Sequence, residues 1–60
     1  MEADLTYYRR RSAEELAAAA ATRNKKVRAV HLDLATRYDE RVVSLAAEQR
    51  RSEMHLVPAA

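Results

Sequence analysis

The chain has 60 residues, no cysteine, no glycine, one proline, and a net charge of +2 from 11 basic and 9 acidic residues. A chain this short buries only about 60% of the surface that its unfolded form exposes, so a lone core is marginal without a disulfide, a metal or a partner. The absent cysteine excludes disulfides and thiolate metal sites, and the interspersed charges are typical of a solvated surface rather than a nucleic-acid-binding one.

The N-terminal residues 1–4 are acidic and polar, unlike the opening of a secretory signal. The alanine run Ala17 to Ala21 is far shorter than the roughly 20 apolar residues that a membrane-spanning helix needs. We therefore expect a cytoplasmic protein with no membrane association.

The composition predicts a first helix over about residues 5–22, with Asp4 as its N-cap. Alanine has the highest helix propensity, and the carboxylate of a capping Asp accepts hydrogen bonds from free backbone N–H groups. At 100° per residue, one narrow face of this helix collects mainly small residues. We expect this face to consist of Leu5, Tyr8, Ser12, Leu16, Ala19 and Ala20.

A break is expected at Thr22 to Asn24, where Asn24 is a suitable N-cap for the segment that follows. Neither glycine nor proline marks the break. One continuous helix from Asp4 to Glu53 is therefore the alternative, and it would need partners along its whole length.

A second helix is predicted over about residues 25–54, before Pro58 stops any helix and residues 57–60 fray. Its main apolar stripe has the alternating spacings of four and three that pack against another helix. The stripe comprises Val27, His31, Leu34, Tyr38, Arg41 and Leu45, widened by Val30 and Val42.

Folding the second helix back on the first predicts an all-α antiparallel hairpin, in which Tyr8 meets Tyr38, Ser12 meets Leu34 and Leu16 meets His31. The second helix is longer, so about its last three turns would extend past the first. The residues expected to form the hairpin seam are Leu5, Tyr8, Leu16, Val27, His31, Leu34, Tyr38, Val42 and Leu45.

A second, weaker stripe runs down the opposite face of the second helix. A helix that is apolar on two sides needs two neighbours, so we expect a homo-oligomer, a dimer or higher, in which hairpins form a four-helix bundle. The stripe comprises Ala29, Leu32, Thr36, Val43, Ala47 and Met54, and Leu32, Val43, Ala47 and Met54 are the predicted oligomer or partner interface.

Two stretches of the chain resemble a group of short uncharacterised α-proteobacterial proteins. Those proteins share a Tyr-Tyr-Arg-x-Arg stretch and a later Arg-Ala-x-His-x-x-Leu-Ala-x-x-Tyr stretch. They match residues 7–11 here and the run from Arg28 to Tyr38. The resemblance implies a helix–turn–helix unit of bacterial origin, with its break at Thr22 to Lys25, and implies no activity.

The basic residues could form a phosphate-binding patch made of Arg9, Arg10, Arg11, Lys25, Lys26 and Arg28. However, three consecutive helical residues fan over about 200°, so the arginines cannot all face one duplex. Glu14 and Glu15 also lie at spacings that allow ion pairs with Arg10 and Arg11. We therefore favour a solvated, salt-bridged face.

Candidate catalytic residues are few. His31 lies on the main apolar stripe without a second histidine at metal-ligand spacing, so it is expected to be a core-edge histidine with one hydrogen bond. Tyr8 and Tyr38 are expected to pack through their rings. With no glycine-rich phosphate loop and no deep pocket in prospect, we expect neither an enzyme nor a cofactor or metal site.

These observations predict a small helical protein–protein interaction module, an adaptor or regulator, that self-associates or docks on a partner. The alternative is a small nucleic-acid-associated protein that uses Arg9 to Arg11 and Lys25 to Arg28. Salt dependence separates the two, because phosphate binding weakens steeply as salt rises.

Overall fold

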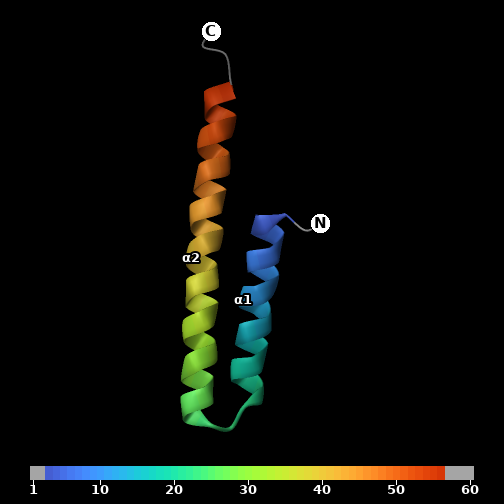
Figure 1. Cartoon of the computed structure of the whole chain (residues 1–60), viewed down its shortest axis with the longest axis vertical. Coiled ribbons are helices and arrows are strands. Elements are labelled where there is room, and N and C mark those ends of the chain that lie inside the picture. Colours follow the sequence, from blue (N-terminus) through green and yellow to red (C-terminus); the bar gives the residue numbers. More distant parts are fainter. Residues whose placement is uncertain (1–2, 57–60) are drawn as a thin grey trace.

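The fold is a hairpin of two helices, seen in a computed structural model that describes residues 3–56, with side chains to residue 53. Helix α1 spans Asp4–Ala21, and helix α2 spans Lys25–Leu56. The helices lie side by side and antiparallel (Figure 1). The predicted helical hairpin is therefore confirmed and the continuous-helix alternative is wrong. The predicted fraying at 57–60, and any contact of the Met54 side chain, fall outside the described residues.

Helix α1 begins one residue earlier than expected. The N-cap is Ala3, and the Tyr7 amide donates a hydrogen bond to the Ala3 carbonyl at 2.9 Å. The prediction that Asp4 is the cap was wrong. Asp4 is instead the first helical residue, where a carboxylate still interacts favourably with the positive end of the helix dipole.

The connection between the helices satisfies the backbone groups at both helix ends. The Thr22 amide donates to the Ala18 carbonyl at 3.2 Å, closing the last turn of α1. Asn24 caps α2 as predicted, because its Oδ1 accepts from the Lys26 amide at 2.9 Å and from the Val27 amide at 3.1 Å. A sharp reversal is thus built without glycine or proline.

The contact between the helices is made of small and polar side chains. Among the described residues, the buried hydrophobic ones are Ala19 and Ala35, and no large side chain is fully buried. Ser12 and Glu15 are also buried. Alanines at the centre let the two backbones approach closely, but they remove little apolar surface from water. The hairpin by itself therefore has a small hydrophobic core.

The observed contact faces are rotated relative to the predicted seam. On α1, Leu16 was expected to be buried in the seam, but it is 48% exposed. Its neighbour Glu15 is buried instead. On α2, Ala35 rather than Leu34 is at the centre, so Val27 and Val30 are exposed. The remaining seam residues are partly buried: Leu5, Tyr8, His31, Leu34, Tyr38, Val42 and Leu45.

Helix α2 is much the longer of the two. Its 32 residues span about 48 Å, whereas the 18 residues of α1 span about 27 Å. Its C-terminal turns consequently extend past the start of α1 (Figure 1). Neither helix, within residues 3–56, contains a stretch both long and apolar enough to cross a lipid bilayer.

Candidate functional site

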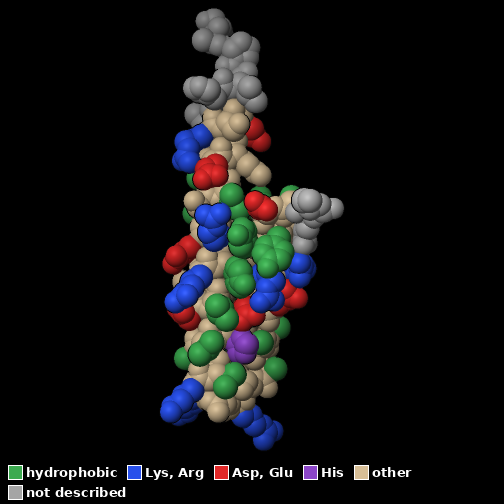
Figure 2. Space-filling view, in the orientation of Figure 1, with side chains coloured by type: hydrophobic (Ala, Val, Ile, Leu, Met, Phe, Trp, Pro, Cys, Tyr) green, Lys and Arg blue, Asp and Glu red, His purple; other side chains and the backbone are tan. Residues whose placement is uncertain are grey.

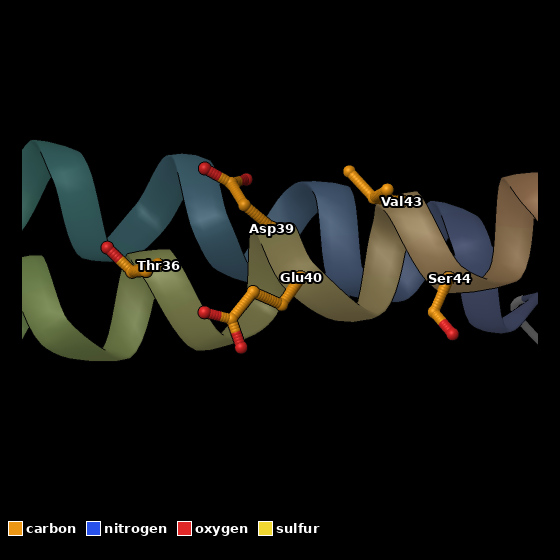
Figure 3. Close-up of a pocket in the computed structure, with 5 residues that line it drawn as sticks. All are labelled: Thr36, Asp39, Glu40, Val43 and Ser44. Carbon is orange, nitrogen blue, oxygen red and sulfur yellow. The ribbon is translucent and has the colours of Figure 1, made fainter.

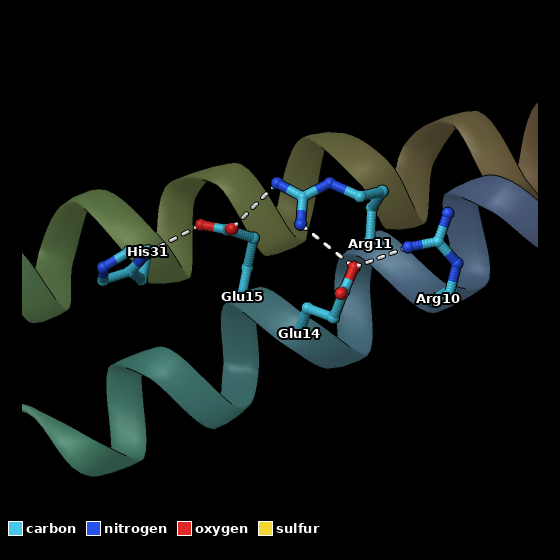
Figure 4. A network of polar contacts seen from close by, with 5 residues as sticks. All are labelled: Arg10, Arg11, Glu14, Glu15 and His31. Atoms are coloured by element: carbon cyan, nitrogen blue, oxygen red, sulfur yellow. Dashed lines mark hydrogen bonds and ion pairs between the residues drawn. The ribbon is translucent and has the colours of Figure 1, made fainter.

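A buried carboxylate joins the two helices. Glu15 Oε1 lies 2.7 Å from His31 Nδ1, and Glu15 Oε2 accepts a hydrogen bond from the Arg11 guanidinium at 3.1 Å (Figure 4). Both oxygens are therefore engaged, as a buried carboxylate requires. The prediction that His31 is a core-edge histidine with one hydrogen bond is confirmed.

Two arginines and Glu14 extend this arrangement along α1. Glu14 Oε1 accepts from Arg10 at 3.1 Å and from Arg11 at 3.0 Å (Figure 4). The predicted pairing of the arginines with Glu14 and Glu15 is thus confirmed. The five residues form what we call the polar network: Arg10, Arg11, Glu14, Glu15 and His31.

The contacts of the polar network stabilise the charged forms of Glu15 and Arg11. The hydrogen bond from His31 lowers the pKa of Glu15, the charges of His31 and Arg11 act in the same direction, and burial opposes them. Hydrogen bonds to Glu14 and Tyr38 raise the pKa of Arg11 above its already high usual value. Proton exchange at neutral pH is therefore not favoured at either group.

Three tyrosines lie together beside the polar network. The ring centres of Tyr8 and Tyr38 are 5.9 Å apart, as predicted, and those of Tyr7 and Tyr8 are 5.2 Å apart. Each ring has a guanidinium over it at 5.3–5.4 Å: Arg10 over Tyr7, Arg11 over Tyr38 and Arg41 over Tyr8. Figure 2 shows one face of the hairpin, with hydrophobic side chains along the junction of the helices and the histidine and charged side chains among and beside them.

A second polar pair crosses between the helices. Ser12 Oγ donates to Asp39 Oδ1 at 2.6 Å and lies 3.4 Å from the Ala35 carbonyl. Ser12 was expected on the face of α1 that contacts α2, opposite Leu34. The sequence did not predict its contact with Asp39, nor the contact of Glu15 with His31. The signal for Glu15 was its position in the run Ser12, Glu15, Ala19, whose spacings of three and four place all three on one helical stripe.

The arrangement has a histidine–carboxylate pair, and no nucleophile is seen bonded to it among residues 3–53. Such a pair orients an imidazole in many catalytic and metal sites. Here the hydroxyl of Ser12 is engaged by Asp39 rather than by His31. Within the described part of the chain, no three potential ligands among His, Asp and Glu come together as a metal site would require. The contacts of Glu15 with His31 and of Ser12 with Asp39 join the two helices.

The basic residues fall into two separate groups. Arg10 and Arg11 belong to the polar network, and Lys25 and Lys26 are exposed at the start of α2. About 16 Å of helix separates Arg10 from the connection. Arg28 belongs to the second group and donates to the Ala19 carbonyl at 3.4 Å and to the Thr22 carbonyl at 2.9 Å. Arg9 is exposed on α1. The structure does not join these residues into one patch.

The predicted interface residues lie outside the hairpin contact. Leu32 is 45% exposed and Val43 is 67% exposed, whereas Ala47 is partly buried. The side chain of Met54 is outside the described part. A shallow hollow of about 380 Å³ lies on the same side of α2 (Figure 3). It is lined by Thr36, Asp39, Glu40, Val43 and Ser44.

Comparison of this chain with protein families, curated proteins and solved structures finds no match.

Proposed function

We propose that this chain is a helical protein–protein interaction module that binds another protein through one side of the hairpin. The observation that carries the proposal is a set of exposed apolar and small uncharged side chains contributed by both helices. We call this set the apolar face: Leu16, Ala20, Leu32, Thr36 and Val43.

The two polar pairs define the sides of the hairpin. His31 precedes the central Ala35 by four residues, and Asp39 follows it by four. About the axis of α2, His31 is therefore rotated by about 40° to one side of Ala35 and Asp39 by about 40° to the other. The pair of Glu15 with His31 therefore closes one side of the helix contact, and the pair of Ser12 with Asp39 closes the other.

The apolar face lies on the side of the second pair. Leu16 follows Ser12 by four residues, and Val43 follows Asp39 by four residues. Each is therefore rotated about its helix axis by a further 40° or so, away from the helix contact and toward this side of the hairpin. Leu32 precedes Asp39 by two full helical turns and belongs to the same stripe. The face is thus formed jointly by α1 and α2.

Its chemistry suits a protein partner better than a small or charged ligand. Three of the large exposed apolar side chains, Leu16, Leu32 and Val43, lie on this side, and neighbouring exposed apolar side chains are typical of an interaction surface. The polar network on the other side is already paired within the chain. The hollow beside Val43 can accept a side chain from a docked helix.

Site-specific photo-crosslinking in cells of the natural host tests this proposal. The photoreactive residue p-benzoylphenylalanine would replace Val43 on the apolar face, or Val30, an equally apolar and exposed residue on α2 outside that face. We expect position 43 to give a discrete crosslinked species whose joined peptides are mapped by mass spectrometry, and position 30 to give none. Equal crosslinking, or none at either position, would contradict the proposal.

A further inference from the structure

Building on the proposed interaction function, we infer that the protein seated on the apolar face is a second copy of this chain. The two hairpins pack face to face as a four-helix bundle. Three independent observations support this occupant: the surface area of the hairpin, the angle between the two contact faces on each helix, and the low net charge of the chain.

The hairpin exposes more surface than a monomer of its size. Its accessible surface is 5065 Å² for a mass of 6.8 kDa. A folded monomeric protein of that mass exposes about 4,000 Å². The excess of about 1,000 Å² is close to the roughly 800 Å² that each partner buries in a standard interface. An interface of standard size with a second copy would cover an area of about this size.

The angle between contact faces matches a bundle. Leu32, Thr36 and Val43 are turned by about 60° to 100° from Ala35, which faces α1. Leu16 and Ala20 are turned by about 40° to 80° from Ser12, which faces α2. In a four-helix bundle each helix contacts two neighbours about a quarter-turn apart. Both helices therefore offer a second contact stripe at the angle that a bundle needs, and on the same side of the hairpin.

The side-chain sizes and charges also permit a copy to approach. The α1 part of the face includes Ala20, with Ala13 and Ala17 exposed beside it, so a neighbouring helix can pack closely. A net charge of only +2 adds little repulsion between two copies. The core of the separate hairpin is small, so burying Leu16, Leu32 and Val43 between copies supplies apolar contact that the single chain lacks.

The test is the mass of the purified full chain, measured by sedimentation equilibrium between about 10 μM and 1 mM. We expect twice 6.8 kDa, and a thermal midpoint that rises with concentration because folding and association are linked. Leu32→Glu with Val43→Glu should halve the mass. The matched control is Val27→Glu with Val30→Glu, because these residues are 41% and 58% exposed on the same helix but outside the apolar face. This control should remain a dimer.

A measurement on the unaltered chain covers the case in which the double variant unfolds. In a mixture of ¹³C-labelled and unlabelled chain, nuclear Overhauser contacts between copies should involve the methyl groups of Leu16, Leu32 and Val43, and should be absent for Val27 and Val30. A monomer at 1 mM, or contacts between copies through Val27 and Val30, would overturn the inference. A monomer that still crosslinks to a different protein through position 43 would overturn only the second copy and would leave the proposed function standing.

Discussion

Glu15 is a carboxylate at a helix–helix contact, where an apolar side chain is the usual occupant. Burying a charge costs free energy unless partners replace the lost water. Arg11 on the same helix and His31 on the other supply those partners at 3.1 Å and 2.7 Å. The contact with Arg11 lies within α1, whereas the contact with His31 exists only when the hairpin is closed.

This pairing predicts an acid-sensitive fold. The pKa of Glu15 is lowered by folding, chiefly by the His31 hydrogen bond. Its stabilising contribution is then fully present above the unfolded value of about 4.3 and is lost as the pH falls through the lower folded value. Urea unfolding measured between pH 6 and pH 2.5 should show a steeper loss of stability below about pH 4.3 for the natural chain than for Glu15→Gln.

The exposed Glu14 provides the control for this experiment. Glu14→Gln removes a neighbouring carboxylate whose ion pairs are screened by solvent, so its pH profile should stay close to that of the natural chain. Finding that Glu15→Gln has the same acid dependence as the unaltered protein would show that Glu15 is not coupled to folding.

The tyrosine pair gives a second prediction for individual residues. The rings of Tyr8 and Tyr38 are 5.9 Å apart, in contact across the helices. A double-mutant cycle built from Tyr8→Ala and Tyr38→Ala, read out by urea unfolding, should show a coupling of about 0.5–1.5 kcal/mol. Effects that add to within about 0.3 kcal/mol would mean that the rings do not interact.

Sequence patterns located the helix faces to within about one residue. The small face of α1 and the Tyr8–Tyr38 contact could be predicted because helical periodicity is regular. Placing Glu15 inside and Leu16 outside could not, because the general preference of charged residues for the surface favours the opposite order. The contact of Glu15 with His31 on the other helix favours the observed placement, and this contact exists only in the packed hairpin.

The elements themselves were more predictable than their packing. Both helices could be predicted because strong helix formers dominate the chain. The start of α2 could be predicted from Asn24, because its cap depends only on the neighbouring backbone amides of Lys26 and Val27. The start of α1 was missed by one residue because Ala3 caps without a side-chain acceptor. Such a cap leaves no residue-type signal.

The Asn24 cap can be tested separately from the rest of the hairpin. Asn24→Ala removes the acceptor for the amides of Lys26 and Val27 and should cost about 1 kcal/mol of unfolding free energy, as caps usually do. Asn24→Asp keeps an oxygen at the same place and should differ little from the natural residue. Guanidinium-induced unfolding measures both, and equal losses in the two variants would rule out a capping role.

On the scale of the whole molecule, the separation of the basic groups argues against a nucleic-acid-binding surface. The triple variant Arg9→Gln, Arg10→Gln, Arg11→Gln should leave binding to duplex DNA or RNA unchanged, because no single basic patch is lost. Fluorescence anisotropy at 50 and 200 mM salt is the measurement. Micromolar binding that weakens with salt and disappears in a triple variant whose helicity by circular dichroism is unchanged would favour the nucleic-acid alternative.

The two polar pairs also bear on the alignment of the helices along their axes. Alanines such as Ala19 and Ala35 would pack almost equally well if one helix slid past the other by a turn of about 5.4 Å. Such a slip would take Glu15 away from His31 and Ser12 away from Asp39, so each of these buried side chains would lose its partner on the other helix. The pairs therefore select a single register for a contact whose apolar part would tolerate several. The two polar pairs therefore determine how the helices are aligned along their axes, which the small apolar core alone would not determine.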